Sequence, residues 1–144
     1  MAHSPLLGPV VTLVAWTLVM LVWMAVTRAG AAKKAGINLG TNRGGRGQDL
    51  DGVVAAEAQW KAHNYVHLME QPTIFYALAF ATYLLGQQSP LTAGLAWGYV
   101  ALRVLHSLIQ VSINRVAIRF LVFSLSTIVL MVWTVSVVLG VTGG

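Results

Sequence analysis

The chain contains no cysteine, and only 9% of its 144 residues are charged. The lack of cysteine excludes disulfides, thiolate nucleophiles and cysteine-based metal sites, so any thiol chemistry needs a sulfur carried by a substrate. A soluble domain usually has about 25% charged residues, whereas 57% of this chain is hydrophobic and its mean hydropathy is +0.73. The scarcity of charge predicts an integral membrane protein with a single domain, residues 1–144.

Long apolar runs predict four membrane-spanning helices, because a helix needs roughly 20 residues to cross the hydrocarbon. We place them at about residues 6–28, 53–85, 91–113 and 116–138. The segment from Ala29 to about Asp51 is rich in glycine, lysine and arginine and is expected to be a loop. Acidic residues near Asp51 are expected to start the second helix. Pro72 removes one helical hydrogen bond, which predicts a kink within the second span.

Positive charge is concentrated in particular loops. Six of the nine basic residues lie between Arg28 and Lys61, and Arg115 and Arg119 lie at the junction of the last two spans. The turn at residues 86–90 and both chain ends carry no lysine or arginine. The positive-inside rule then places both termini outside the cytoplasm. The basic loop is expected to lie beside anionic lipid headgroups and not on nucleic acid.

Polar side chains recur at helical spacing within the later spans. Because residues i, i+4 and i+7 share a helical face, these side chains form three stripes. The stripes are Gln59, His63, His67 and Glu70 in the second span, Arg103, His106, Ser107, Gln110 and Asn114 in the third, and Arg115 and Arg119 beside the fourth. Ionisable groups in hydrocarbon are costly and usually have a partner or a function. Positive charges outnumber Glu70 here, which predicts a pocket for an anionic ligand entering from the cytoplasm.

Other interpretations of these stripes remain open from the residues alone. They could be structural contacts between packed helices, such as an ion pair between Glu70 and Arg103. His63 and His67 also have the spacing of metal ligands, and His106 could join them, but nearby arginines would repel a cation. A hydrolase is disfavoured because the chain has no G-x-S-x-G nucleophile elbow, and no G-x-x-x-x-G-K phosphate loop occurs either.

Two segments resemble motifs of a known family. Residues 62–76, AHNYVHLMEQPTIFY, are similar to the second-helix motif of the MAPEG proteins, the membrane-associated proteins in eicosanoid and glutathione metabolism. Residues 97–107, WGYVALRVLHS, followed by Asn114, Arg115 and Arg119, resemble the third and fourth helices of its bacterial branch. The resemblance implies an all-α, left-handed four-helix bundle, assembled as a homotrimer in the bacterial inner membrane.

The resemblance also implies a function. It predicts a membrane-embedded glutathione-dependent transferase or peroxidase-like enzyme that acts on lipophilic electrophiles, with glutathione bound between protomers on the cytosolic side. The expected partners are glutathione, a lipophilic substrate from the bilayer and further copies of the chain, with no nucleic acid and no metal. The alternative is a non-catalytic lipid-binding or scaffold membrane protein of the same fold.

Site residues are carried over position by position. Arg119 is similar to the fourth-helix arginine that stabilises the glutathione thiolate, and Glu70 to the acid that engages the glutathione amine. The other residues that the resemblance places at the glutathione site are Arg28, His63, His67, Arg103, His106, Gln110 and Arg115. At the positions of His63, His67 and Gln110, the family usually has a basic residue, an asparagine and a tyrosine.

Overall fold

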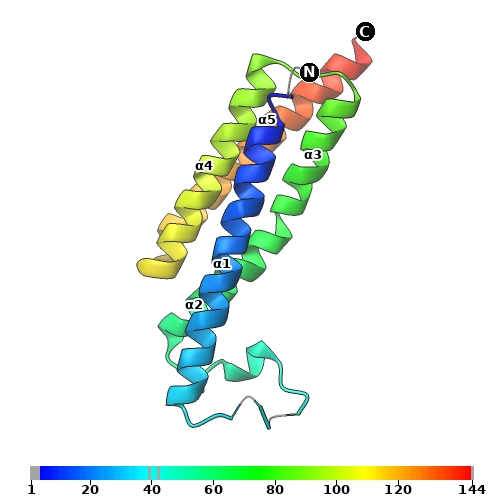
Figure 1. Cartoon of the computed structure of the whole chain (residues 1–144). Coiled ribbons are helices and arrows are strands. Elements are labelled where there is room, and N and C mark those ends of the chain that lie inside the picture. Colours follow the sequence, from blue (N-terminus) through cyan, green and yellow to red (C-terminus); the bar gives the residue numbers. More distant parts are fainter. Residues whose placement is uncertain (1–3, 39, 42, 144) are drawn as a thin grey trace.

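The computed structural model describes residues 4–38, 40–41 and 43–143. Its elements in chain order are α1 (Leu7–Lys34), the 3₁₀ helix η1 (Gly47–Leu50), α2 (Ala56–Glu70), α3 (Pro72–Leu84), α4 (Pro90–Ser112) and α5 (Val116–Thr142). They form an elongated bundle of four rods, and α2 followed by α3 makes the second rod (Figure 1). No strand occurs in these ranges, so the predicted all-α four-helix architecture is confirmed.

The first and last rods are long enough to cross a bilayer. α1 has 28 residues and α5 has 27, and both are apolar along their length. At about 1.5 Å per residue each extends about 40 Å, which exceeds a hydrocarbon core of about 30 Å. Large apolar side chains, among them Val11, Leu18 and Phe120, are exposed on the outside of the bundle. Such a continuous apolar surface suits contact with lipid.

The end of the first helix differs from the prediction. The expected span stopped at Arg28, whereas α1 continues six residues further, to Lys34. The alanines after Arg28 are strong helix formers, and the two lysines of the last turn complement the negative end of the helix dipole. Gly36 follows just beyond the end of the helix, and its φ of +74° suits a residue without a Cβ. The loop is therefore shorter than the glycine content suggested.

The start of the second rod also differs from the prediction. The acidic segment near Asp51 does not begin α2 but forms the separate turn η1, in which the Asp49 carboxylate accepts a hydrogen bond from the Arg46 backbone N–H at 2.7 Å. Gly52 follows with a φ of +77°, which interrupts helical geometry. α2 begins only at Ala56.

The predicted interruption of the second rod at Pro72 is confirmed. α2 ends at Glu70, and Pro72 occupies the first position of α3, where its missing N–H leaves no partner unsatisfied. Gln71 joins the two helices and keeps helical angles, with φ −60° and ψ −36°. Its side-chain Nε2 donates to Thr127 Oγ1 at 2.7 Å, and its Oε1 lies 3.4 Å from the Tyr99 hydroxyl. The break is therefore tied to both α4 and α5.

An aromatic cluster fills the core beyond this break. The Phe75 ring stacks on the Tyr99 ring with centroids 4.8 Å apart, and it meets the Trp133 ring edge-on at 5.9 Å. All three side chains are fully buried, and α1 adds Leu13 and Met20 to the same core. Aromatic pairs of this geometry stabilise a core beyond their buried area, by about 0.5–1.5 kcal/mol each.

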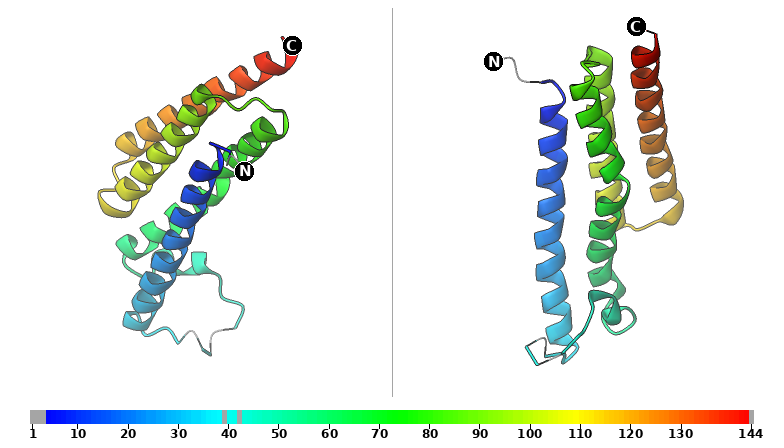
Figure 2. Two further views of the ribbon diagram at one scale, coloured as in Figure 1. Left: turned by 45° about the horizontal axis from the view of Figure 1, so that its top comes forward. Right: turned by 90° about the vertical axis from the view of Figure 1, so that its right-hand side faces the viewer.

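The two ends of the bundle are different. Both chain termini lie at one end, and the loop between α1 and α2 lies at the other (Figures 1 and 2). The lower turns of α1 and α2 extend beyond the junction of α4 and α5 (Figure 2). The polar stripes consequently lie between the aromatic core and the basic loop.

Candidate functional site

Three helices enclose a cleft on the loop side of the aromatic core. Its volume is about 330 Å³. Its walls are His63, Val66, His67 and Glu70 from α2, His106 and Gln110 from α4, and Val116, Arg119, Phe120 and Phe123 from α5. The three stripes expected from helical spacing thus meet on one surface, which we call the α2–α4–α5 cleft.

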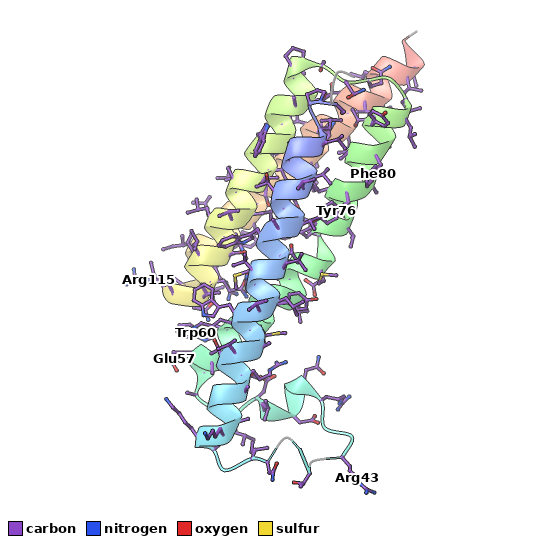
Figure 3. All side chains as sticks on the ribbon, in the orientation of Figure 1. Arg43, Glu57, Trp60, Tyr76, Phe80 and Arg115 are labelled. Atoms are coloured by element: carbon purple, nitrogen blue, oxygen red, sulfur yellow. The ribbon has the colours of Figure 1, made fainter. Side chains whose placement is uncertain are left out.

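Six of the nine predicted site residues line this cleft: His63, His67, Glu70, His106, Gln110 and Arg119. The other three lie elsewhere. Arg103 is buried behind the cleft wall, and Arg28 lies against the loop between α1 and α2. Arg115 is exposed just before α5, on the outside of the bundle (Figure 3).

Arg119 is oriented by the turn that precedes its helix. Asn114 adopts a φ of +52°, a left-handed conformation that asparagine tolerates better than most residues. This conformation lets the Asn114 Oδ1 accept a hydrogen bond from Arg119 Nη1. The Arg119 Nε is buried, and within the described chain it has no hydrogen-bond partner. The Arg119 side chain as a whole lines the cleft.

Glu70 and Arg103 do not form the direct ion pair that a purely structural interpretation anticipated. The His67 ring stands between them, with Nδ1 3.1 Å from Glu70 Oε2 and Nε2 3.4 Å from Arg103 Nη1. The physical reason is depth: Arg103 is fully buried, while the Glu70 side chain is 63% exposed at the cleft. The imidazole of His67 connects the buried guanidinium to the exposed carboxylate.

Arg103 is the most deeply buried cation of the described residues. Its Nε donates to the Tyr99 hydroxyl at 2.9 Å, and its guanidinium carbon lies 5.4 Å from the Tyr99 ring centre and 5.3 Å from that of Phe123. A planar, weakly hydrated guanidinium suits such a position between aromatic faces better than an ammonium would. Arg103 is thus committed to internal partners and does not line the cleft.

Two further rings complete the wall around His67. The His106 ring centroid lies 4.8 Å from that of His67, and the Phe123 centroid lies 5.4 Å from it. His106 is buried, so packing against neighbouring side chains fixes the position of its ring. This part of the cleft is therefore a wall of rings contributed by α2, α4 and α5.

Arg28 belongs to a separate network, which we call the loop clasp (Arg28, Gly47, Asp51, Gln59 and His63). Arg28 Nε donates to Gln59 Oε1 at 3.2 Å, while Gln59 Nε2 donates to the Gly47 carbonyl at 3.2 Å and to Asp51 Oδ1 at 2.5 Å. His63 Nε2 lies 3.3 Å from the same Asp51 oxygen. The hydrogen bond from Gln59, followed by the contact with His63, holds the pKa of Asp51 below its ordinary value of 3.8. The clasp fastens the loop to the edge of the cleft through His63.

With this geometry in view, the family can be stated. A family model, the MAPEG family, matches residues 6–139. The chain belongs to the MAPEG family. No curated protein and no solved structure matches it significantly. The match and the apolar helices make it a membrane protein, and MAPEG membership associates it with membrane glutathione-related transferase or peroxidase-type function in general.

The cleft of this MAPEG protein combines charged, imidazole and apolar side chains. In the part of the chain that the structure describes, no three histidine or carboxylate side chains are grouped as metal ligands. The cleft offers one guanidinium, one carboxylate, three imidazoles and apolar rings. Such a mixture can bind a molecule that carries both charges and can hold an apolar group beside it.

Among the contributors that were not assigned to the site from the sequence, three affect its geometry. Phe123 lies four residues after Arg119, and this spacing on one helical face would have found it. Asn114 was recognised as polar, but its support of Arg119 depends on a left-handed turn that spacing does not reveal. Asp51 reaches His63 only because the loop folds back, and no sequence signal predicts that contact.

Proposed function

We propose that this MAPEG protein is a glutathione-dependent transferase or peroxidase-like enzyme acting on lipophilic electrophiles, with Arg119 stabilising the thiolate. The observation that carries the proposal is the presence of Arg119 and Glu70 in one cleft of about 330 Å³. Glutathione carries a thiol, carboxylates and an amine, so it can place its sulfur near Arg119 and its amine near Glu70. Two opposite charges on one surface would also fix the direction in which it binds.

Arg119 would act by changing the ionisation of the thiol. A free thiol has a pKa of about 8.5, so only about 3% is thiolate at pH 7. A positive charge within about 4–6 Å lowers a pKa by roughly 1–3 units, which raises the thiolate fraction by about 10- to 30-fold at neutral pH. The thiolate is the reactive nucleophile.

In the conjugation step, the thiolate sulfur attacks an electrophilic carbon of the co-substrate. A carbon–sulfur bond forms, the leaving group departs with its electron pair, and the proton of the thiol has already passed to water. The lipophilic partner would arrive along α5, where Phe120 lines the cleft and is also exposed on the outside of the bundle. Holding both reactants in one cleft would supply much of the rate.

The proposal includes assembly and orientation. We infer a homotrimer in the bacterial inner membrane, with both termini outside the cytoplasm and glutathione between adjacent protomers. The basic loop supports this orientation, because positive residues favour the cytoplasmic side. Arg28 and Arg115, which do not line the cleft of their own protomer, would be available to a ligand shared with a neighbouring subunit.

Ultraviolet difference spectroscopy tests the proposal directly. Glutathione added to the detergent-purified protein should produce thiolate absorbance, and Arg119→Ala should lower this signal by about 10- to 30-fold. Arg119→Lys keeps the charge and should retain part of it. Absence of the signal from the unmodified protein, or its persistence in Arg119→Ala, would refute the assignment.

One observation favours the alternative of a non-catalytic lipid-binding or scaffold protein. Gln110 lines the cleft where glutathione-using members of the family usually have a tyrosine. The alternative predicts that ligands bind but that chlorodinitrobenzene, a general test electrophile, is not conjugated. A measurable rate of conjugation that depends on Arg119 would exclude it.

A further inference from the structure

The two polar neighbours of His67 require different hydrogen-bonding roles from its two ring nitrogens. Glu70 Oε2, 3.1 Å from Nδ1, can only accept a hydrogen bond as a carboxylate. Arg103 Nη1, 3.4 Å from Nε2, can only donate one. Both contacts are satisfied together by a neutral imidazole that carries its proton on Nδ1. A doubly protonated ring would direct an N–H at the N–H of Arg103.

The ring is also held from the sides. The His106 and Phe123 rings lie with their centroids 4.8 Å and 5.4 Å from that of His67. These rings come from α4 and α5, while His67 and Glu70 are on α2. Rotation of the imidazole about its side chain would therefore disturb two other helices, and the ring provides a fixed support for the Glu70 carboxylate.

We propose that His67 is a positioning residue that couples Glu70 to the buried Arg103 and thereby holds the carboxylate where a ligand's ammonium group binds. Arg103 contributes through this imidazole and not by touching the ligand. The inference rests on the proposed function for the identity of the ligand, which is an amino-acid-type thiol with a free amine. The imidazole link itself is independent of that identity.

Substitutions at position 67 separate the packing of the ring from its two hydrogen bonds. Phenylalanine keeps a ring between His106 and Phe123 but removes both hydrogen bonds. Asparagine can place an N–H close to the position of Nδ1, so it keeps the bond to Glu70, but it is too short to reach Arg103. Tyr65→Phe is the matched control, because Tyr65 is on the same helix and does not line the cleft.

The tautomer can be measured without any ligand. The chain has four histidines, so ¹⁵N-histidine NMR of the labelled protein gives few ring signals, and their comparison with His67→Phe identifies those of residue 67. We expect a protonated Nδ1 and an unprotonated Nε2 at neutral pH. A ring protonated on Nε2, or on both nitrogens, would overturn the proposed link.

Binding measurements test the consequence for the ligand. His67→Phe should weaken glutathione binding by about 10- to 100-fold, as expected for losing the support of one charged hydrogen bond. His67→Asn loses only the link to Arg103 and should weaken binding by an intermediate factor of about 3- to 10-fold, while Tyr65→Phe should change it by less than about threefold. Glutathione acetylated on its amine should bind the unmodified protein and His67→Phe equally. An equal loss for both ligands would show a merely structural role and refute the inference.

The two proposals fail in different ways. If the unmodified protein binds no glutathione, the proposed function falls, and the tautomer measurement still decides the link between Glu70 and Arg103. If glutathione binds and His67→Phe binds it as tightly, the proposed function stands and the positioning role of His67 is wrong.

Discussion

Asn114 allows the backbone and side-chain contributions to the site to be separated. It has a φ of +52°, and its side chain accepts the hydrogen bond from Arg119. Asn114→Gly removes the side chain but keeps the left-handed turn accessible. Asn114→Ala removes the same side chain and adds a Cβ in a conformation that costs about 1–2 kcal/mol. Glycine loses about 0.5–1 kcal/mol of additional chain entropy on folding, so the alanine variant should be less stable than the glycine variant by about 0.5–1 kcal/mol.

The loss of the acceptor should affect both variants equally. A hydrogen bond to a charged group contributes about 1.5–3 kcal/mol when it is buried. Arg119 is only half-buried, so solvent screening reduces this contribution to about 1–1.5 kcal/mol. That value corresponds to about a five- to tenfold change in an equilibrium constant. Each variant should therefore show a five- to tenfold lower thiolate signal with glutathione.

Two assays check these numbers. Denaturation of the detergent-solubilised protein gives the difference in free energy of unfolding between the two variants, and ultraviolet difference titration gives the thiolate signal. If both variants unfold alike, the left-handed turn does not restrict residue 114. If the thiolate signal equals that of the unmodified protein in both, Asn114 does not orient Arg119, and the argument for the turn fails.

Three other changes have defined outcomes. Gln71→Leu should lower the free energy of unfolding by about 1–3 kcal/mol, because it removes the side-chain hydrogen bonds that join the break to Tyr99 of α4 and Thr127 of α5, as denaturation will measure. Arg103→Lys should destabilise the protein by a similar amount or more, since an ammonium cannot reproduce the contacts of the guanidinium with Tyr99 and Phe123. The depressed pKa of Asp51 means that its contribution is present above 3.8 and is lost as the pH falls through the lower folded value. The protection factors of loop amides in hydrogen exchange should therefore fall below pH 3.8 in the unmodified protein, and Asp51→Asn should remove this pH dependence.

Much of the fold was predictable because it depends on hydrophobic length and one proline. The third and fourth spans were expected at about 91–113 and 116–138, and the structure has α4 at Pro90–Ser112 and α5 at Val116–Thr142. The break at Pro72 was predicted from its missing N–H. The end of α1 was not, because alanine and lysine continue a helix beyond the membrane, where hydropathy no longer reports helical structure.

The sequence predicted which helical faces carry the site residues, but it did not predict the contacts between their side chains. Helical spacing correctly indicated that the polar stripes of three helices meet, since six of the predicted residues line one cleft. Helical spacing does not tell how deeply a side chain is buried, however. The direct ion pair between Glu70 and Arg103 does not form, because His67 lies between the two side chains. Arg28 was predicted from resemblance, and its position in the loop clasp depends on a loop whose path no periodicity describes.

The break at Gln71 has a consequence for how the molecule can change. Beyond it lies the aromatic core of Phe75, Tyr99 and Trp133, and before it lies the cleft. Tyr99 is the residue shared by both parts, through its ring on one side and its hydroxyl on the other. Substitutions that change the ligand can therefore alter the cleft surface of α2 and α5 while the aromatic core keeps the helices assembled. The helices around the aromatic core therefore act as a scaffold, and the cleft side of the break can be varied as long as Tyr99 is kept.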